Sequence, residues 1–432
     1  MSRENALFAL SRFGMGASPG DASSIASDPR GWVLDQLSSA VLPPQLAGLP
    51  DGAQSLRRLG QLKQERKDKT DANKGELRQL YLTEAAARTR AGAVSPTPVI
   101  ERLVRFWSNH FTVSTLRLTV VPIAGAFERE VVRPHVLGRF HDMLRAAIRH
   151  PAMLAYLDNT QSIGPHSMAG EKRAKGLNEN LARELLELHT LGVDGGYAQA
   201  DVEAMAAMLT GWTFDPRDGG FRYAPRLHEP GAKTLLGSRF EGGEMEAERA
   251  LLMLARSPAT ARFIATKLAR HFAADDPPPA LVDALSRTFT DTDGDLLAVT
   301  KILVTRAETW AQPLAKIRSP DDLVVATMKA MGGDLGADQR LIQSLTLMGQ
   351  MPWRAPSPAG WPDRGEAWVG PEALMRRLEW AKAVADRMAR QAPADLAERI
   401  IAAGPATRQA MDSAKGRDAL FLLLSSREFQ RR

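Results

Sequence analysis

Hydrophobic residues recur at intervals of three and four positions through most of the chain, while alternating runs bounded by turn residues are few. The first pattern places apolar side chains on one face of an α-helix, and the second is typical of a half-buried strand. The sequence therefore predicts a mainly α protein that consists of one large multi-helical domain.

One segment, residues 213–243, departs from the helical pattern. Short stretches with aromatic residues and threonine alternate there with glycine and proline. Because glycine and proline favour turns, this segment predicts a small β-hairpin inserted between helices.

A change in composition near residue 98 suggests an internal division. Residues 53–90 predict a long charged helix or a helical hairpin, and the string AGAVSPTP at 91–98 ends that polar stretch. A more apolar block begins at Val99. We expect N-terminal helices with a charged hairpin over residues 1–98 and the main helical body over residues 99–432.

The most polar predicted helix is NENLARELLELHTLG, from Asn178 to Gly192. Asn178 can cap its beginning, Glu179 is favourable at the positive end of a helix, and Gly192 can adopt the left-handed turn that closes it. At 100° per residue, Asn180, Glu184 and Glu187 share a polar flank.

The same helix carries further polar groups on other faces. Glu179 and Arg183 are spaced as an i,i+4 ion pair, while Asn178 and His189 align on another face. Its leucines require burial, and an unpaired buried polar group costs on the order of 1 to 3 kcal/mol. We therefore expect partners from other segments, and the best candidates are Asn109, His110, Asp158, Asn159, Tyr197 and Asp201.

Two interpretations of this cluster stand. In the first, the helix lines a cleft in which a general acid and a general base are drawn from Glu179, Glu184, Glu187 and His110. In the second, the same groups form an internal network of salt bridges and hydrogen bonds that orders the helices. The turn LHEPGAKTLLG adds His228 to the candidate binding residues.

The composition restricts metal chemistry. The chain has no cysteine, which excludes disulfides, thiolate nucleophiles and cysteine-ligated metal centres. On the polar helix, His189 lies about 200° from Glu187 and about 140° from Glu184, so no histidine–glutamate pair is placed to chelate. We predict no metal site and no cofactor. The alternative is a metal held by histidines from separate helices, His110, His150 or His228.

Charge and hydropathy restrict the partners. The chain has 432 residues, 56 Lys and Arg and 50 Asp and Glu, and its densest basic stretch, residues 56–80, is mixed with acidic residues. We therefore expect no nucleic-acid surface. No window reaches the roughly 18 consecutive apolar residues of a membrane span, and the first residues lack a signal-peptide pattern.

Several motifs together resemble one bacterial family, the domain-of-unknown-function family number 1800. They are RFGMGASPGD, FWSNHFTVS, HPAMLAYLDN, NENLARELLELHTLGVDGGYAQADVEAMAAMLTGWTF, LHEPGAKTLLG, SPAGWPDRGEAW and SSREFQRR. The resemblance implies one family domain over nearly the whole chain and supplies no established activity. Where the family typically has threonine as a helix cap, this chain has Ala198, which deprives Asp201 of its capping-box partner.

The resemblance also implies a genetic context. Family members commonly occur beside a second uncharacterised family that resembles alkaline phosphatases and sulfatases and carries a twin-arginine export signal. A chain without its own signal peptide is then expected in the periplasm by co-export with such a partner, or otherwise in the cytoplasm.

Two functions follow as hypotheses. The first is a hydrolase or lyase that acts on a glycan or a similar polar polymer by carboxylate acid–base chemistry at the 178–192 helix. The second is a non-catalytic partner or co-export subunit of the phosphatase- or sulfatase-like protein. The sequence does not decide whether the protein is an enzyme.

Overall fold

The computed structural model describes residues 3–38, 41–65, 70–173, 176–215, 217, 219–393 and 395–432, the side chains of 63–74 and 173 excepted. The described chain is mainly α-helical with two small β-hairpins, so the predicted fold class is confirmed. The predicted helical hairpin of residues 53–90 corresponds to two helices, α4 and α5, and residues 66–69 between them lie outside the described part.

The N-terminal half contains the following helices: α1 (Arg3–Arg12), α2 (Asp21–Ser24), α3 (Pro29–Asp35), η1 (Gln36–Ser38), η2 (Pro44–Leu46), α4 (Gly52–Glu65), α5 (Thr70–Val94), α6 (Pro98–His110), η3 (Val121–Ile123), α7 (Ala124–Phe127), η4 (Glu128–Val132), α8 (Arg133–His135), α9 (Phe140–Arg149), α10 (Pro151–Tyr156), η5 (Asn159–Gln161), α11 (Gly170–Arg173), α12 (Asn180–Glu184), η6 (Leu185–Thr190) and α13 (Gln199–Leu209). Of the short η elements, η4 and η6 are π-helical and the others are 3-10 turns.

The C-terminal half contains these helices: η7 (Pro225–Leu227), α14 (Glu246–Ala255), α15 (Pro258–Phe272), α16 (Pro279–Asp291), α17 (Leu296–Thr305), α18 (Ala307–Trp310), α19 (Pro320–Ala330), α20 (Asp338–Leu347), η8 (Gly365–Trp368), α21 (Pro371–Met388), α22 (Leu396–Ile400), α23 (Pro405–Asp412), α24 (Gly416–Ser425) and α25 (Arg427–Gln430).

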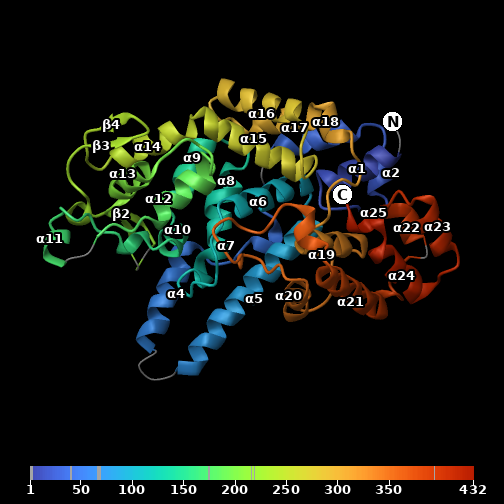
Figure 1. Cartoon of the computed structure of the whole chain (residues 1–432). Coiled ribbons are helices and arrows are strands. Elements are labelled where there is room, and N and C mark those ends of the chain that lie inside the picture. Colours follow the sequence, from blue (N-terminus) through green and yellow to red (C-terminus); the bar gives the residue numbers. More distant parts are fainter. Residues whose placement is uncertain are drawn as a thin grey trace.

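Segments far apart in the sequence pack together in the body of the molecule (Figure 1). α15 packs against α16, α16 against α17, and α17 against α3 near the start of the chain. α5 contacts α6 as well as α19 and α20. The two ends also meet, because Arg12 Nη2 donates a hydrogen bond to the backbone oxygen of Arg432 at 3.0 Å.

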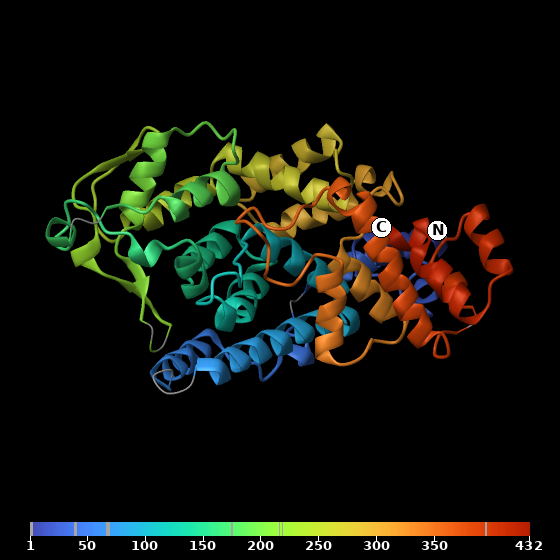
Figure 2. The same ribbon diagram turned by 60° about the horizontal axis from the view of Figure 1, so that its bottom comes forward.

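One hydrophobic core runs through the described chain, from Ala6 to Phe429. It contains Tyr81 of α5 together with Val99 and Leu103 of α6, so burial continues across residues 98 and 99. The end of α4 and the beginning of α5 project from this body (Figures 1 and 2), and the two helices are joined by an ion pair between Arg58 and Glu76.

The polar helix predicted from Asn178 to Gly192 is present but is not α-helical throughout. Its first turns are α12, and residues Leu185–Thr190 form the π-helix η6. Thr190 Oγ1 donates to the backbone oxygen of Leu185 at 2.7 Å. A π-helix has more residues per turn than an α-helix, so the 100° spacing used to assign faces fails beyond Glu184. Gly192 closes the helix with a φ of 86°, as predicted.

The predicted β insertion contains two antiparallel hairpins rather than one. β1 (Trp212–Phe214) pairs with β2 (Phe221–Tyr223), with Trp212 opposite Tyr223. β3 (Lys233–Leu235) pairs with β4 (Ser238–Phe240), and β3 packs on α13.

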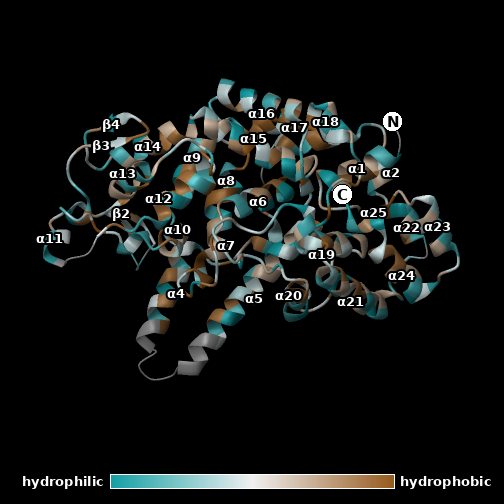
Figure 3. Ribbon diagram, in the orientation of Figure 1, coloured by the Kyte–Doolittle hydropathy of each residue, from teal (hydrophilic) through white to brown (hydrophobic). Residues whose placement is uncertain are grey.

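In the described part of the chain, no helix has the length and apolar character needed to cross a membrane. Figure 3 shows polar and apolar residues mixed along the helices, as expected for elements that bury one side and solvate the other.

Candidate functional site

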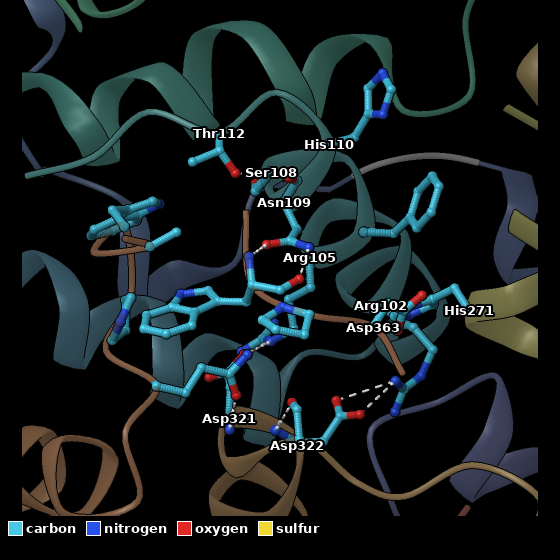
Figure 4. A pocket seen from close by; sticks show the side chains of 18 of the residues that line it. Arg102, Arg105, Ser108, Asn109, His110, Thr112, His271, Asp321, Asp322 and Asp363 are labelled. Atoms are coloured by element: carbon cyan, nitrogen blue, oxygen red, sulfur yellow. Dashed lines mark hydrogen bonds and ion pairs between the residues drawn. The ribbon is translucent and has the colours of Figure 1, made fainter. Parts of the chain in front are cut away.

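A cavity of about 110 Å³ lies where four parts of the chain meet: the end of α6, the C-terminal half of α15, the first turn of α19, and residues 350–368 (Figure 4). We call residues 350–368 the tryptophan-rich segment, because three tryptophans within it line the cavity, Trp353, Trp361 and Trp368. This stretch is also rich in proline, and hydrogen bonds to Asn109 and Ser114 pack it across the helical body.

Asn109 at the end of α6 holds the tryptophan-rich segment in place. Its Nδ2 donates to the backbone oxygen of Trp361 at 2.9 Å, and its Oδ1 accepts from the backbone nitrogen of Trp361 at 2.7 Å. Gly360 adjoins this contact with a φ of 82°, and a Cβ there would come within 2.5 Å of the Asn109 backbone oxygen. Only glycine therefore fits at position 360 without displacing the anchor.

Further hydrogen bonds fasten the same segment to the helical body. The backbone nitrogen of Thr115 donates to the Trp353 oxygen at 2.8 Å, and Ser114 Oγ donates to the Ala355 oxygen at 2.8 Å. The hydroxyl of Tyr81, on α5, donates to the Pro352 oxygen at 3.0 Å. The wall of the cavity formed by the segment is thus tied to α5 and to residues 114 and 115, which follow α6.

A histidine–aspartate pair lines the cavity. His271, near the end of α15, has its Nδ1 3.0 Å from Oδ1 of Asp363 in the tryptophan-rich segment (Figure 4). The other ring nitrogen, Nε2, is buried and has no hydrogen-bond partner in the described chain. An ionised Asp363 accepts a hydrogen bond from Nδ1–H, and in this tautomer Nε2 carries the free lone pair of the ring.

The charges around this pair favour an ionised aspartate and a neutral imidazole. Burial by itself would raise the pKa of Asp363, but its interaction with His271, including their hydrogen bond, and the charges of Lys316 and Arg432 lower it to about 2. Burial lowers the pKa of His271 below its usual value, partly opposed by the negative charge of Asp363. At neutral pH His271 is therefore a base held in orientation by a carboxylate.

The floor of the cavity contains two aspartates from the first turn of α19. Asp322 lies 3.1 Å from Arg102 and 3.0 Å from Arg432 (Figure 4). Burial alone would raise the pKa of Asp322, but these arginines hold it well below the usual range. Asp321 accepts from Arg105 Nε at 2.8 Å through Oδ2, while its Oδ1 is buried without a hydrogen-bond partner in the described chain.

A lysine and a histidine face the cavity from α15 and α6. Burial lowers the pKa of Lys267 to about 8. Burial also lowers the pKa of His110 well below 6.5, and the charge of Lys267 adds to this effect. His110 Nε2 lies 3.1 Å from the backbone oxygen of His189, so the π-helix η6 touches the residues that form the cavity.

The catalytic candidates are divided between two places. His110 and Asn109 line the cavity, whereas Glu179, Glu184 and Glu187 are not among its lining residues. The predicted ion pair of Glu179 and Arg183 is present at 2.7 Å. The assignment of catalysis to the three glutamates stays a prediction.

Glu184 and Glu187 are half-buried, and their carboxylates form no hydrogen bond or ion pair within the described residues. Burial and the charge of Glu187 raise the pKa of Glu184. Burial also raises the pKa of Tyr197, with a smaller contribution from Glu187. The polar flank therefore exists, but it lies outside the cavity that Asn109 and His110 line.

Around the same helix, His189 is buried with no hydrogen-bond partner in the described chain for either ring nitrogen, and burial lowers its pKa to about 3. Asn178 Oδ1 accepts from the backbone nitrogen of Asn180 at 3.0 Å, but the N-cap position of α12 belongs to Glu179 and not to Asn178 as predicted. Asp201 accepts from the backbone nitrogens of Ala198 at 2.8 Å and Leu236 at 2.6 Å, which joins the start of α13 to the second hairpin.

The other candidate binding residues have structural partners. Asp158 pairs with Arg117 at 2.6 Å. Asn159 is buried and donates to the backbone oxygens of Leu209 and Trp212 at 3.1 and 2.9 Å. His228 Nδ1 lies 2.9 Å from the Thr210 oxygen.

The three histidines considered as metal ligands have separate neighbours. His110 lies against His189, as described above, while His150 Nε2 is 3.1 Å from Glu130 and His228 Nε2 is 3.0 Å from Glu246. Within the described residues, no three histidine or carboxylate side chains are grouped so that they could hold a metal ion.

Sequence reasoning missed four residues that the cavity brings together: His271, Asp363, Lys267 and Asp321. They are ordinary polar residues on three separate segments, because His271 and Lys267 share α15, and His271 and Asp363 are 92 positions apart. The one available signal was the density of tryptophan and proline in the tryptophan-rich segment.

The fold and the cavity define a mainly α protein with a buried, charge-lined site between helices. The chain belongs to the family described as "Protein of unknown function (DUF1800)", whose model matches residues 8–431 and so covers nearly the whole chain. No curated protein and no solved structure matches it.

Proposed function

We propose that the protein is an acid–base enzyme, a hydrolase or lyase, that acts on a glycan or a similar polar polymer in the cavity between α6, α15 and the tryptophan-rich segment. The observation that carries the proposal is the pair of His271 and Asp363, with His271 Nε2 left without a partner in the cavity wall. A buried group without a partner costs free energy, and a bound substrate or water would satisfy it.

His271 is the proposed general base. Asp363 holds Nδ1 and stabilises the imidazolium that forms when Nε2 accepts a proton. In a hydrolase that proton comes from the attacking water, and in a lyase it comes from the carbon next to the breaking bond. Asp363 acts through His271 and is therefore a positioning residue.

The remaining lining supports a hydroxylated substrate. Asp321 Oδ1 is a buried acceptor and Trp353 Nε1 a buried donor, and neither has a hydrogen-bond partner in the described chain. The indole rings of Trp361 and Trp368, with centroids 6.3 Å apart, add flat apolar surface. Apolar surface with a few placed polar groups is the usual composition of a small-molecule site, and sugars present both kinds of surface.

The test is a panel of neutral and acidic polysaccharides, assayed for new reducing ends and for the ultraviolet absorbance of unsaturated products. We expect His271→Gln to lower kcat about 10²-fold to 10⁴-fold, the usual contribution of a general base. Asp363→Asn should lower kcat less and change its pH dependence, because the base remains but its orientation and charge partner change.

A matched control is available in His166, which forms a histidine–glutamate pair with Glu229 at 2.6 Å but is 78% exposed. His166→Gln should leave activity unchanged. Equal activity of His271→Gln and the wild type on a cleaved substrate would refute the assignment, and Glu184→Gln in the same panel tests the polar helix.

The second hypothesis, a non-catalytic partner of a phosphatase- or sulfatase-like protein, predicts no turnover anywhere in the panel. It also predicts that the tagged chain co-purifies from the periplasm with its genetic neighbour and is absent from the periplasm when that neighbour is deleted. Retention in the cytoplasm in both strains would refute co-export.

A further inference from the structure

Each arginine that lines the cavity lies within ion-pair distance of a carboxylate. Arg102 and Arg432 share Asp322, and Arg105 is bound to Asp321. The remaining lining arginine, Arg88, lies 2.6 Å from Glu128. These guanidinium groups therefore have counter-charges before any ligand enters.

Lys267 is different. No hydrogen bond or ion pair joins its ammonium group to another described residue, although the side chain lines the cavity. Its Nζ lies 5.3 Å from the centroid of the Phe263 ring, one turn earlier on α15. A cation without a direct ion-pair partner in a partly desolvated wall is unfavourable, and a bound anion would relieve the cost.

The charged groups around Lys267 do not neutralise its ammonium group. Asp363 favours its charged form and Arg270 opposes it. Asp363 is already engaged by His271, while His110 and His189 are held neutral by burial. The negative charge that acts on the ammonium group thus comes from Asp363, whose carboxylate is already bound to His271.

We propose that Lys267 binds an oxyanion on the substrate, so that the polymer cleaved in this cavity carries a carboxylate, sulfate or phosphate group. That the bound oxyanion belongs to a substrate rests on the proposed function, but the binding of an oxyanion at Lys267 is tested separately. His271 and Lys267 are one helical turn apart on α15, so the anionic group would lie beside the bond at which the base acts.

The experiment is an NMR titration of the full chain with ¹³C at the lysine Cε positions, with the Lys267 signal assigned by its loss in Lys267→Met. Burial lowers the pKa of Lys267 to about 8, so the signal should titrate near that pH, well below ordinary lysines. Added sulfate, phosphate or acetate, at ionic strength held constant with chloride, should raise the midpoint. A rise of about one unit corresponds to an anion bound tenfold more tightly by the charged form.

The three anions distinguish the chemical group, and a neutral oligosaccharide should not move the midpoint. Lys301, exposed on α17, serves as the control lysine within the same spectrum. In direct binding measurements, Lys267→Met should weaken an acidic oligosaccharide about tenfold or more and leave a neutral one unchanged, while Lys267→Arg should restore part of the binding.

A Lys267 midpoint that none of the anions moves, together with equal affinity of the wild type and Lys267→Met for acidic oligosaccharides, would overturn the proposal. The readout needs no turnover. If His271→Gln leaves activity unchanged, only the catalytic assignment is refuted. If anions do not move the Lys267 midpoint and Lys267→Met binds acidic oligosaccharides as the wild type does, only the oxyanion site is refuted.

Discussion

The anchor between Asn109 and the tryptophan-rich segment allows a quantitative prediction. Asn109→Ala removes two hydrogen bonds to the backbone of Trp361, at 2.9 and 2.7 Å. A hydrogen bond of this kind contributes about 1 kcal/mol net, so the docked segment should lose about 2 kcal/mol. At 1.4 kcal/mol per factor of ten, the segment should open roughly 30-fold more often.

Hydrogen exchange of backbone amides measures this opening. The amides of Trp361 and Thr115 report it, because the first bonds to Asn109 and the second bonds to the Trp353 oxygen at 2.8 Å. We expect about 30-fold faster exchange at Thr115 in Asn109→Ala, and lower activity, because Asp363 lies in the loosened segment.

The matched control is Asn178→Ala, which removes one hydrogen bond, to the backbone nitrogen of Asn180 at 3.0 Å, and lies outside the cavity lining. It should leave exchange at Thr115 unchanged. Unchanged exchange at Thr115 in Asn109→Ala as well would show that the other contacts hold the segment without Asn109, and would refute the reasoning.

Three further predictions concern pH and backbone conformation. The value of kcat/KM should fall below pH 6.5, where His271 gains a proton, and again near pH 8, where Lys267 loses one. A flat profile from pH 5 to pH 9 would contradict both roles. The folded-state pKa of His189 is lowered to about 3, so its contribution to stability is present above the unfolded pKa of 6.5 and is lost as the pH falls. From pH 7 to pH 5, the free energy of unfolding of His189→Leu should therefore rise by about 2 kcal/mol relative to that of the wild type, as measured by urea unfolding. An equal pH dependence of stability in both proteins would count against this reasoning. Gly360→Ala should destabilise the protein by more than about 1 kcal/mol, because φ is positive there and the Asn109 backbone obstructs a Cβ. Gly370→Ala should not, because a Cβ at position 370 meets no atom within 4 Å. Equal unfolding midpoints of the two variants would disprove the difference.

The local features of the polar helix could be predicted because each depends on neighbouring residues. The pairing of Glu179 with Arg183 and the left-handed Gly192 both follow from spacing and residue type. The π-helix η6 could not be predicted in the same way. Its buried residues include His189, and it packs against α15, a segment more than 60 positions away that local spacing does not reveal.

The candidate site shows the same limit. Local pattern pointed to Asn109 and His110 as partners, and both line the cavity. It linked them to the glutamates of the polar helix, since the helix was the richest polar segment in the sequence. The structure places Asn109 against the tryptophan-rich segment instead, and that segment brings Asp363 to His271.

By itself the sequence determined the mainly α class, the small β insertion and the family, because these depend on the period of hydrophobic residues, on turn residues and on motifs contiguous in the chain. Only the tertiary structure decided which polar residues share a cavity. The period of a helix states which side chain is buried, but the partner that satisfies a buried charge comes from whichever segment packs there. For His271 that partner is Asp363, and for Lys267 no described residue supplies one.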